Sequence, residues 1–188
     1  MTDIRGNFQL GPGSGGRLLL KTGRAGLAAR AGHDLTIEVT RWSATVTVPD
    51  EDGGGLAAAT VTAELDLGSL AVREGTGGAK ALSDRDRRDI EATAGKILPG
   101  SASYASSRAI PASSGGAIEG TLTLHGRSGP LRLQLDSPAP GRFKGSATVR
   151  QTAFGITPYS GFFGTLKLRD EITVQVEADL NQAARERG

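Results

Sequence analysis

Two histidines, His33 and His125, are the side chains of this chain best suited to proton transfer or metal binding near neutral pH. They lie far apart in the sequence and lack the close spacing with which one helix presents two ligands to zinc. A histidine in such a setting is more often a structural residue, with its ring hydrogen-bonded to the backbone or to a carboxylate. We therefore predict no catalytic residue and no metal site. An enzyme acting on an apolar lipid through His33 or His125 is kept as an alternative.

Two glycine-rich segments carry partial phosphate-binding motifs. GPGSGG at 11–16 has the spacing of a dinucleotide-binding loop, but the sequence around it predicts neither the preceding strand nor the following helix that such a loop requires. GTGGAK at 75–80 lacks a Lys directly after its second glycine and a Ser or Thr after Lys80. No serine occupies the GxSxG turn of a hydrolase. No cofactor is predicted.

Charge and composition exclude several other functions. The 188 residues carry 22 Lys and Arg against 20 Asp and Glu, and the two signs are interspersed, as in SDRDRRDI at 83–90. A nucleic-acid partner needs clustered cations, and single-strand binders add aromatic platforms, so no such partner is predicted. Cysteine is absent, which excludes internal disulfides and thiolate metal sites.

The location of the protein is predicted from its N-terminus and its apolar runs. The first residues, MTDIRGNFQLGPG, include Asp3 and no apolar run of the length of a secretory signal. Nothing later reaches the roughly 18 apolar residues of a membrane-spanning helix. The sequence therefore predicts a cytoplasmic protein with no membrane span.

Strands are the elements that must position any site, because apolar and polar residues alternate along much of the chain. The apolar members of the longest series are Leu122, Leu124, Leu131, Leu133, Leu135, Phe143, Ala147 and Val149. A two-residue period is typical of strands with one dry face. Abundant glycine and the lack of a sustained helical pattern favour short strands joined by tight turns. We predict an all-β fold closed into a barrel with an apolar interior, which suggests binding rather than chemistry.

The alternation of apolar and polar residues shifts by one position within a long predicted strand. The apolar residues have odd numbers over 35–39 and even numbers over 42–48. A slip of one residue turns every later side chain to the opposite face of the sheet. A bulge, bend or break is therefore predicted near Thr40 and Arg41.

Helices are predicted at two places only. Ser83 is a suitable N-cap for a helix over 84–98, and the acidic residues that follow it favour the positive end of the helix dipole. A short helix is predicted within 23–34, with Leu27 on its apolar face and Gly32 at its end.

The chain is predicted to form one domain with a tail at each end. Residues 1–15 are expected to be a flexible tail, since GPGSGG offers linker chemistry and little to bury. Residues 16–180 form the barrel domain, and residues 181–188 form a frayed C-terminal tail.

An aromatic loop is the remaining unusual feature. TPYSGFFGTLKL at 157–168 places Tyr159, Phe162 and Phe163 among Gly, Pro and Ser residues. Monomers avoid large exposed apolar patches, so the simplest expectation is that these rings fold onto the barrel rim. The alternatives are a gate for an apolar ligand and a contact in a homodimer.

Four stretches, in this order, resemble the YceI-like family: GHDLTIEVTRWSATVTV at 32–48, LSDRDRRDIEATAGKILPGSASYASS at 82–107, LTLHG at 122–126 and RQTAFGI at 150–156. The resemblance covers residues 17–180. It implies a bacterial protein with an antiparallel, eight-stranded, lipocalin-like barrel, often dimeric, that holds a long isoprenoid chain in its lumen. It also implies a His after the first strand, here His33, and a helix that opens around the Asp and Arg residues of 84–89.

The leading hypothesis is non-enzymatic binding, storage or transport of an apolar isoprenoid-like ligand. Such a barrel has room for one slim ligand, and small residues such as Ala63 leave space that larger ones would fill. A ligand-free structural or stress-response module, its lumen packed by its own side chains, is the other alternative. The predicted ligand-binding residues are His33, Ile37, Val39, Val61, Ala63, Leu65, Leu122, Leu124, Phe143, Ile156 and Phe163.

Overall fold

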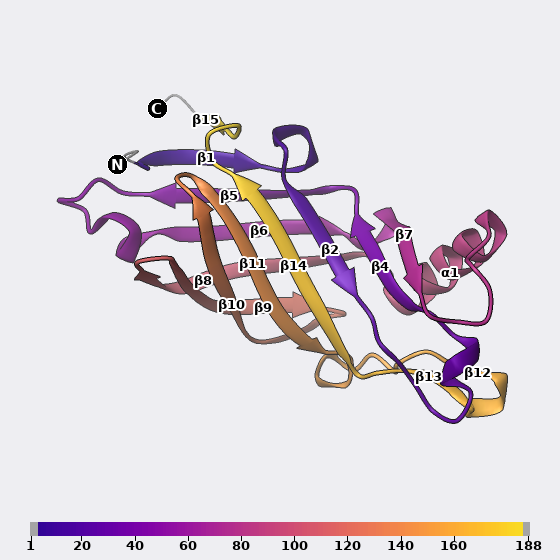
Figure 1. Cartoon of the computed structure of the whole chain (residues 1–188). Helices are drawn as coiled ribbons and strands as arrows, with labels where there is room; N and C mark the ends of the chain where they lie inside the picture. Colours follow the sequence, from indigo (N-terminus) through magenta and orange to yellow (C-terminus); the bar gives the residue numbers. More distant parts are fainter. Residues whose placement is uncertain (1–3, 186–188) are drawn as a thin grey trace.

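The computed structural model describes residues 4–185 as an all-β fold with one α-helix (Figure 1). The strands in the first half of the chain are β1 (Gly6–Leu10), β2 (Arg17–Lys21), β3 (Arg24–Ala25), β4 (Asp34–Val39), β5 (Trp42–Val48), β6 (Thr60–Asp66) and β7 (Leu70–Thr76). The helix α1 (Asp84–Ile97) follows. The later strands are β8 (Ser101–Ala112), β9 (Gly115–Leu124), β10 (Arg127–Ala139), β11 (Arg142–Arg150), β12 (Ser160–Gly161), β13 (Leu166–Leu168), β14 (Glu171–Asp179) and β15 (Ala184–Arg185).

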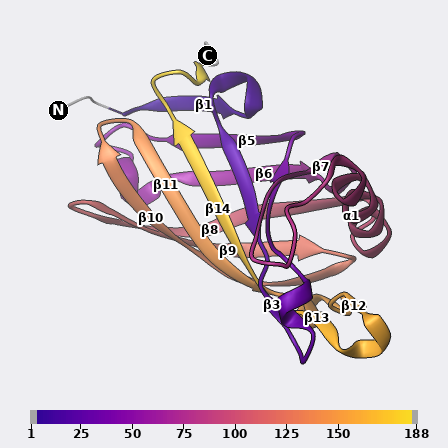
Figure 2. The same ribbon diagram turned by 45° about the vertical axis from the view of Figure 1, so that its right-hand side comes forward.

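The main sheet is antiparallel and curls into a barrel. Its hydrogen-bonded order is β15-β1-β5-β6-β8-β9-β10-β11-β14-β2-β4-β7. Three pairs of consecutive strands, β1–β2, β4–β5 and β6–β7, are halves of longer strands that bend in the middle. If each pair is counted as one strand, eight long strands form a ring in which β14 meets β2, β2 meets β4, and β6 meets β8. The predicted all-β barrel is confirmed, and Figures 1 and 2 show its curled wall from two sides.

The predicted change of phase is confirmed as the bend between β4 and β5. The backbone N–H and the hydroxyl of Thr40 both donate to the carbonyl of Ser69, with a hydroxyl distance of 2.8 Å. The backbone N–H of Arg41 donates to the Ser69 hydroxyl at 2.9 Å. Ser69 belongs to a short 3-10 turn (Leu67–Ser69) that separates β6 from β7. The long strand β4–β5 and the long strand β6–β7 therefore bend at the same level and stay paired. Their apolar faces point inward on both sides of the bend.

The prediction of a flexible tail over residues 1–15 is wrong for the residues that the structure describes. β1 pairs with β5 over five register positions, from Gly6 opposite Val48 to Leu10 opposite Ala44. Phe8 is 1% exposed in a core cluster that includes Leu180. The GPGSGG segment is thus a turn between two halves of one strand. Residues 1–3 lie outside the described residues.

The C-terminal tail is corrected in the same way. β15 pairs with β1, so the chain adds a short strand beside the N-terminal one. The backbone N–H and side chain of Asn181 and the side chain of Gln182 donate to the Asp179 carboxylate. The frayed tail predicted for 181–188 is therefore wrong for 181–185, and 186–188 lie outside the described residues.

The helix predicted over 84–98 is confirmed as α1. The Ser83 hydroxyl accepts from the Asp86 backbone N–H, and the Asp86 carboxylate accepts from the Ser83 backbone N–H, which forms a reciprocal cap. The other predicted helix, within 23–34, is wrong. β3 and a 3-10 turn (Ala29–Ala31) occupy that segment, and Leu27 is 96% exposed.

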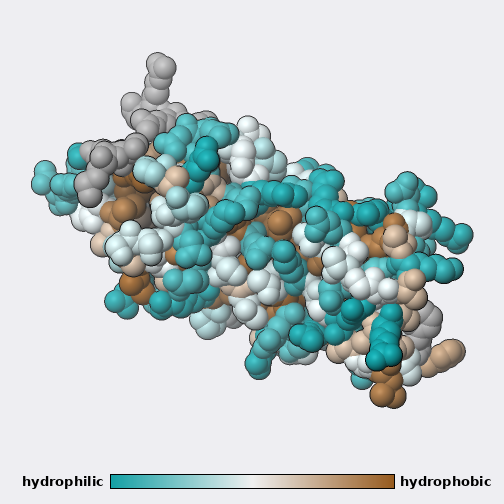
Figure 3. All heavy atoms as spheres, viewed as in Figure 1, coloured by the Kyte–Doolittle hydropathy of each residue, from teal (hydrophilic) through white to brown (hydrophobic). Residues whose placement is uncertain are grey.

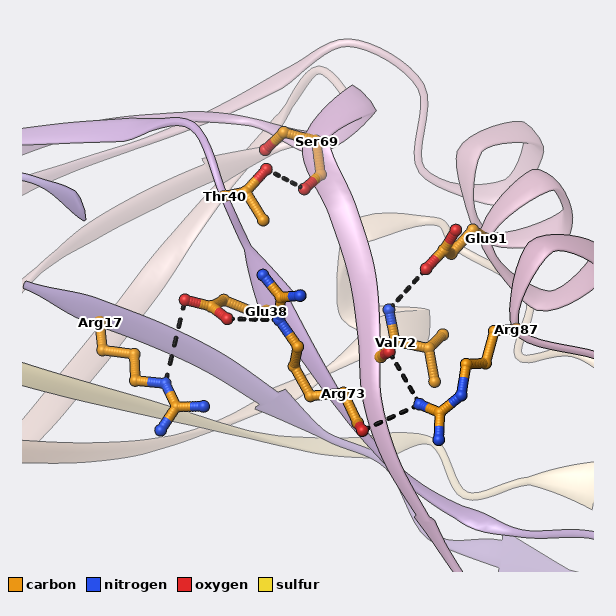
Figure 4. Close-up of polar contacts among 8 residues, drawn as sticks. All are labelled: Arg17, Glu38, Thr40, Ser69, Val72, Arg73, Arg87 and Glu91. Carbon is orange, nitrogen blue, oxygen red and sulfur yellow. Dashed lines mark hydrogen bonds and ion pairs between the residues drawn. The ribbon is translucent and has the colours of Figure 1, made fainter. Parts of the chain in front are cut away.

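Two side chains of α1 hold the helix on the edge strand β7 (Figure 4). The Val72 backbone N–H donates to Glu91 Oε1 at 2.8 Å, and Arg87 Nη1 donates to the carbonyls of Val72 and Arg73 at 3.0 and 2.9 Å. These bonds satisfy backbone groups that an edge strand otherwise leaves free. The helix is therefore fixed across one end of the barrel.

Candidate ligand-binding cavity

A single continuous cavity of about 860 Å³ fills the barrel. Its wall is made by the inward-facing apolar side chains of the long strands, and α1 adds the face that carries Ile90, Ala94 and Ile97. The alternate residues of the same strands face solvent and form cross-strand ion pairs, such as Lys144–Glu177 at 3.3 Å and Arg150–Glu171 at 3.2 Å. The alternation seen in the sequence thus produces a dry interior and a charged exterior.

The cavity extends along nearly the whole barrel. On β9 it is lined at both ends of the strand, by Gly115 and by Leu124. Nine steps of about 3.3 Å give a span on the order of 30 Å along the strand. Strands in a barrel tilt by roughly 40°, so the corresponding length along the axis is about 23 Å. A volume of this size with this length suits a long, narrow molecule.

Nine of the eleven predicted binding residues line the cavity. They are His33, Ile37, Val61, Ala63, Leu65, Leu122, Leu124, Phe143 and Ile156. They come from β4, β6, β9 and β11 and from two connecting segments. The structure therefore brings residues that are more than 100 positions apart to one surface. Their role in binding a ligand stays a prediction.

The other two predicted residues do not line the cavity. Val39 is 0% exposed, but it is the last residue of β4 and pairs with Leu70 immediately before the bend. Phe163 lies on a loop outside the barrel with its side chain fully exposed. The expectation that this ring folds onto the barrel rim is therefore wrong, although Tyr159 of the same segment does reach the cavity.

The end of the cavity beside α1 carries a cluster of polar groups. His33 Nε2 lies 2.7 Å from the carbonyl oxygen of Lys80, to which it donates. Arg24 donates from Nη1 to the Gly32 carbonyl at 2.6 Å, and its backbone N–H donates to Asp34 Oδ1 at 2.8 Å. The GTGGAK segment lies over these side chains, since a Cβ at Gly77 would collide with Arg24 and one at Gly78 with the His33 ring. It is a close-packed cover, which explains its glycines without a phosphate.

His125 is remote from this polar end. It occupies the tight turn between β9 and β10, where its φ is 52° and its side chain is exposed. It does not line the cavity. The expectation of a buried, hydrogen-bonded ring is wrong for His125. Within residues 4–185, no group of three His, Cys, Asp or Glu side chains is placed to hold a metal ion.

The sequence-based list missed several polar residues of the lining, among them Tyr104, Trp42 and Gln151. Tyr104 is half-buried, with its hydroxyl 3.4 Å from the carbonyls of Ile118 and Leu131. Burial, with a smaller contribution from Glu119, raises the pKa of Tyr104, so the phenol stays neutral. Trp42 also lines the cavity, and its buried Nε1 has no hydrogen-bond partner among the described residues.

Gln151 is another missed residue, although it lies in the RQTAFGI stretch that carries the family resemblance. It begins the 3-10 turn Gln151–Phe154, lines the cavity and is 7% exposed. Its Nε2 donates to the Arg169 carbonyl at 3.0 Å. The same turn is fixed from outside by Asp170, whose carboxylate accepts from the backbone N–H and hydroxyl of Thr152 at 2.8 and 2.6 Å. The motif is therefore a wall element held on both sides.

The Asp170 contact is expected to make the stability of the protein depend on acidity. The hydroxyl and backbone N–H of Thr152 lower the pKa of Asp170. The pKa of an Asp side chain in the unfolded chain is about 3.9. When folding lowers the pKa, the ionised carboxyl stabilises the fold at any pH above about 3.9. This stabilisation is lost as the pH falls through the pKa of the folded state. In Asp170→Asn, the loss of stability on acidification should be smaller than in the wild type, as measured by thermal unfolding over a pH series.

The matched control for this effect is Asp52→Asn, in the exposed β5–β6 connection. It should keep the wild-type dependence of stability on pH. Identical pH profiles for the wild type and Asp170→Asn would contradict the assigned role of Asp170.

A curled antiparallel barrel around a long apolar cavity, with a helix across one end, is a lipocalin-like fold. A family model described as the YceI-like domain matches residues 25–180. The chain belongs to the YceI-like family. A comparison with curated proteins found no significant match.

Several solved structures share this fold at low sequence identity. Burkholderia cenocepacia BcnA has a TM-score of 0.57 at 15% identity, with 87% of this chain and 95% of that chain covered. A polyisoprenoid binding domain from Saccharophagus degradans, implicated in plant cell wall breakdown, has a TM-score of 0.52 at 10% identity, covering 93% and 97%. A Campylobacter jejuni YCEI protein has a TM-score of 0.53 at 13% identity, covering 81% and 85%.

Proposed function

We propose that this protein binds one long, apolar, isoprenoid-like molecule inside the barrel and stores or carries it without chemical change. The observation that carries the proposal is the cavity. It extends from one end of β9 to the other with a mainly apolar lining, and the apolar face of α1 lines one side of it. The similarity to a structure described as a polyisoprenoid binding domain supports the same ligand class.

The energetics of such binding are favourable. Each buried methylene contributes about 0.8 kcal/mol, so ten of them contribute about 8 kcal/mol. Association costs an estimated 4–15 kcal/mol in lost translational and rotational freedom. Ten buried methylenes therefore offset the lower part of this cost, and each further methylene that the cavity buries strengthens binding. Because that interaction has no directionality, the chain length of the ligand matters more than any single contact.

The enzymatic alternative has weaker support in the geometry. The His33 ring nitrogen Nε2 is engaged by a backbone carbonyl, and no carboxylate is hydrogen-bonded to that ring among the described residues. His125 faces solvent in a turn outside the cavity lining. Holding an apolar ligand needs none of these polar groups, whereas catalysis needs a reactive atom held beside them.

The proposal is tested by identifying what the folded protein holds. The protein is purified from its own host, extracted with organic solvent, and the extract is analysed by mass spectrometry with a stoichiometry per chain. We expect one isoprenoid-like species near one molecule per chain. An empty extract from folded protein that also takes up no apolar fluorescent probe would favour a barrel packed by its own side chains and would overturn the proposal.

A further inference from the structure

A small three-stranded sheet projects from one end of the barrel and carries two fully exposed apolar side chains. Strands β12, β13 and β3 form this sheet, separate from the main one. Leu27 is 96% exposed, and Phe163 is exposed completely. Figure 1 shows the sheet at the lower right of the molecule, and Figure 3 shows brown and tan apolar atoms protruding from the same region. We call the segments 24–32 and 159–169 the tip.

The tip holds its apolar side chains outward by specific backbone contacts. Gly26 has a φ of 91° and lies against the Thr165 backbone, so a side chain there would collide with it. The Ala28 N–H donates to the Thr165 carbonyl at 2.9 Å, which places Leu27 next to the loop that carries Phe163. Phe163 itself has a φ of 55°, a left-handed conformation that is costly for a bulky residue. Residues held in such conformations cluster at functional sites.

The charge of the tip has one sign. Its two segments contain four basic residues, Arg24, Arg30, Lys167 and Arg169, and no Asp or Glu. Arg24 is neutralised by Asp34. Arg30 and Lys167 are exposed, and neither forms an ion pair with a described residue. Exposed apolar side chains flanked by unpaired cations match the surface of an anionic lipid bilayer.

Both segments of the tip also contribute residues to the cavity lining. Ala31 and Gly32 on one segment line the cavity, as do Tyr159, Leu166 and Leu168 on the other. The outward-facing Leu27 and Phe163 therefore lie within a few residues of lining positions along both segments.

We propose that the tip docks on the surface of an anionic lipid membrane, with Leu27 and Phe163 entering the lipid interface and Arg30 and Lys167 facing the headgroups. This inference rests on the proposed function, because a long apolar ligand is dissolved in a bilayer before it is bound. Docking at this end brings the cavity lining next to the hydrocarbon from which such a ligand is loaded.

A second copy of the chain fits the tip less well. Two tips brought together by a twofold axis would place Arg30 and Lys167 of both copies near one another, which is repulsive. Two exposed side chains per copy also offer far less area than the roughly 1,200 Å² or more that a stable interface buries. A dimer through the tip is therefore a distinct outcome of the test.

The test is binding to vesicles made of phosphatidylcholine and phosphatidylglycerol, measured by co-sedimentation. The wild type is expected to bind, and Leu27→Ser and Phe163→Ser are each expected to weaken the partition about tenfold, since each removes one large apolar side chain from the interface. Arg30→Gln with Lys167→Gln should weaken binding to these vesicles and leave binding to pure phosphatidylcholine unchanged. The matched control is Arg108→Gln, an exposed cation of β8 that lies outside the cavity lining and should bind these vesicles as the wild type does.

Docking and ligand binding are separated by also measuring the ligand content of each variant by mass spectrometry. Loss of vesicle binding with the ligand retained would support the role of the tip. Vesicle binding that is equal in the wild type, Leu27→Ser and Phe163→Ser would overturn it. A dimer that forms with increasing protein concentration in the absence of vesicles, and that Phe163→Ser abolishes, would also overturn the role of the tip in membrane docking. If the wild type binds vesicles through the tip but holds no ligand, the proposed function is contradicted and the docking role of the tip is not.

Discussion

Ala63→Phe is expected to lower the amount of bound ligand at least tenfold while the barrel stays folded. Ala63 lies in the middle of β6, lines the cavity, and is paired with Ala44 on one side and Tyr104 on the other. A phenyl ring at this position would project into the cavity beside Ala44 and Tyr104 and take up volume that the ligand would otherwise fill. Excluding only two methylenes of ligand costs about 1.6 kcal/mol, which is more than tenfold in affinity.

The measurement is the molar ratio of ligand to chain by mass spectrometry, accompanied by thermal unfolding. Thr62→Phe is the matched control, because Thr62 is the exposed neighbour on the same strand and its side chain faces away from the cavity. It should keep the wild-type ratio. Unchanged occupancy in a folded Ala63→Phe protein would show that the ligand does not occupy this part of the barrel.

Phe8→Ala is expected to reduce the free energy of unfolding by about 3–5 kcal/mol, the usual cost of truncating a buried Phe. The Phe8 side chain is 1% exposed and packs in the cluster formed by Leu10, Val48 and Leu180. It lies on β1, which completes the first bent strand of the ring and pairs with both β5 and β15. Denaturant unfolding monitored by circular dichroism measures the change.

Asn7→Ala provides the matched control for this effect. Asn7 is the exposed neighbour of Phe8 on β1 and pairs with Thr47, and its replacement should change stability by about 0.5 kcal/mol or less. If Phe8→Ala were as mild as Asn7→Ala, the N-terminal segment would not contribute to the core. The flexible-tail expectation would then hold in place of the observed strand.

Local features of the sequence predicted most of the individual elements. The two-residue alternation around Leu131 and Leu133 requires one dry face per strand, whatever the neighbouring strands are. The reciprocal cap at Ser83 and the change of phase at Thr40 are likewise decided by residues within one or two turns of chain. Nine of the eleven predicted residues share one surface, because inward-facing positions on any strand of a barrel face the same interior, and their role in binding a ligand stays a prediction.

The sequence by itself therefore determined an all-β barrel with an apolar interior and a capped helix, while the tertiary structure alone decided how the ends and loops are used. GPGSGG resembles a linker, and only the pairing of β1 with β5 shows that Phe8 is buried. Gln151 looks like a surface residue until the carbonyl of Arg169 accepts its side-chain hydrogen bond. Phe163 would be expected at the barrel, and only the structure shows that its side chain is fully exposed on the tip, with a φ of 55°. Each of these outcomes depends on a contact between residues far apart in the chain, which local propensity and periodicity do not encode.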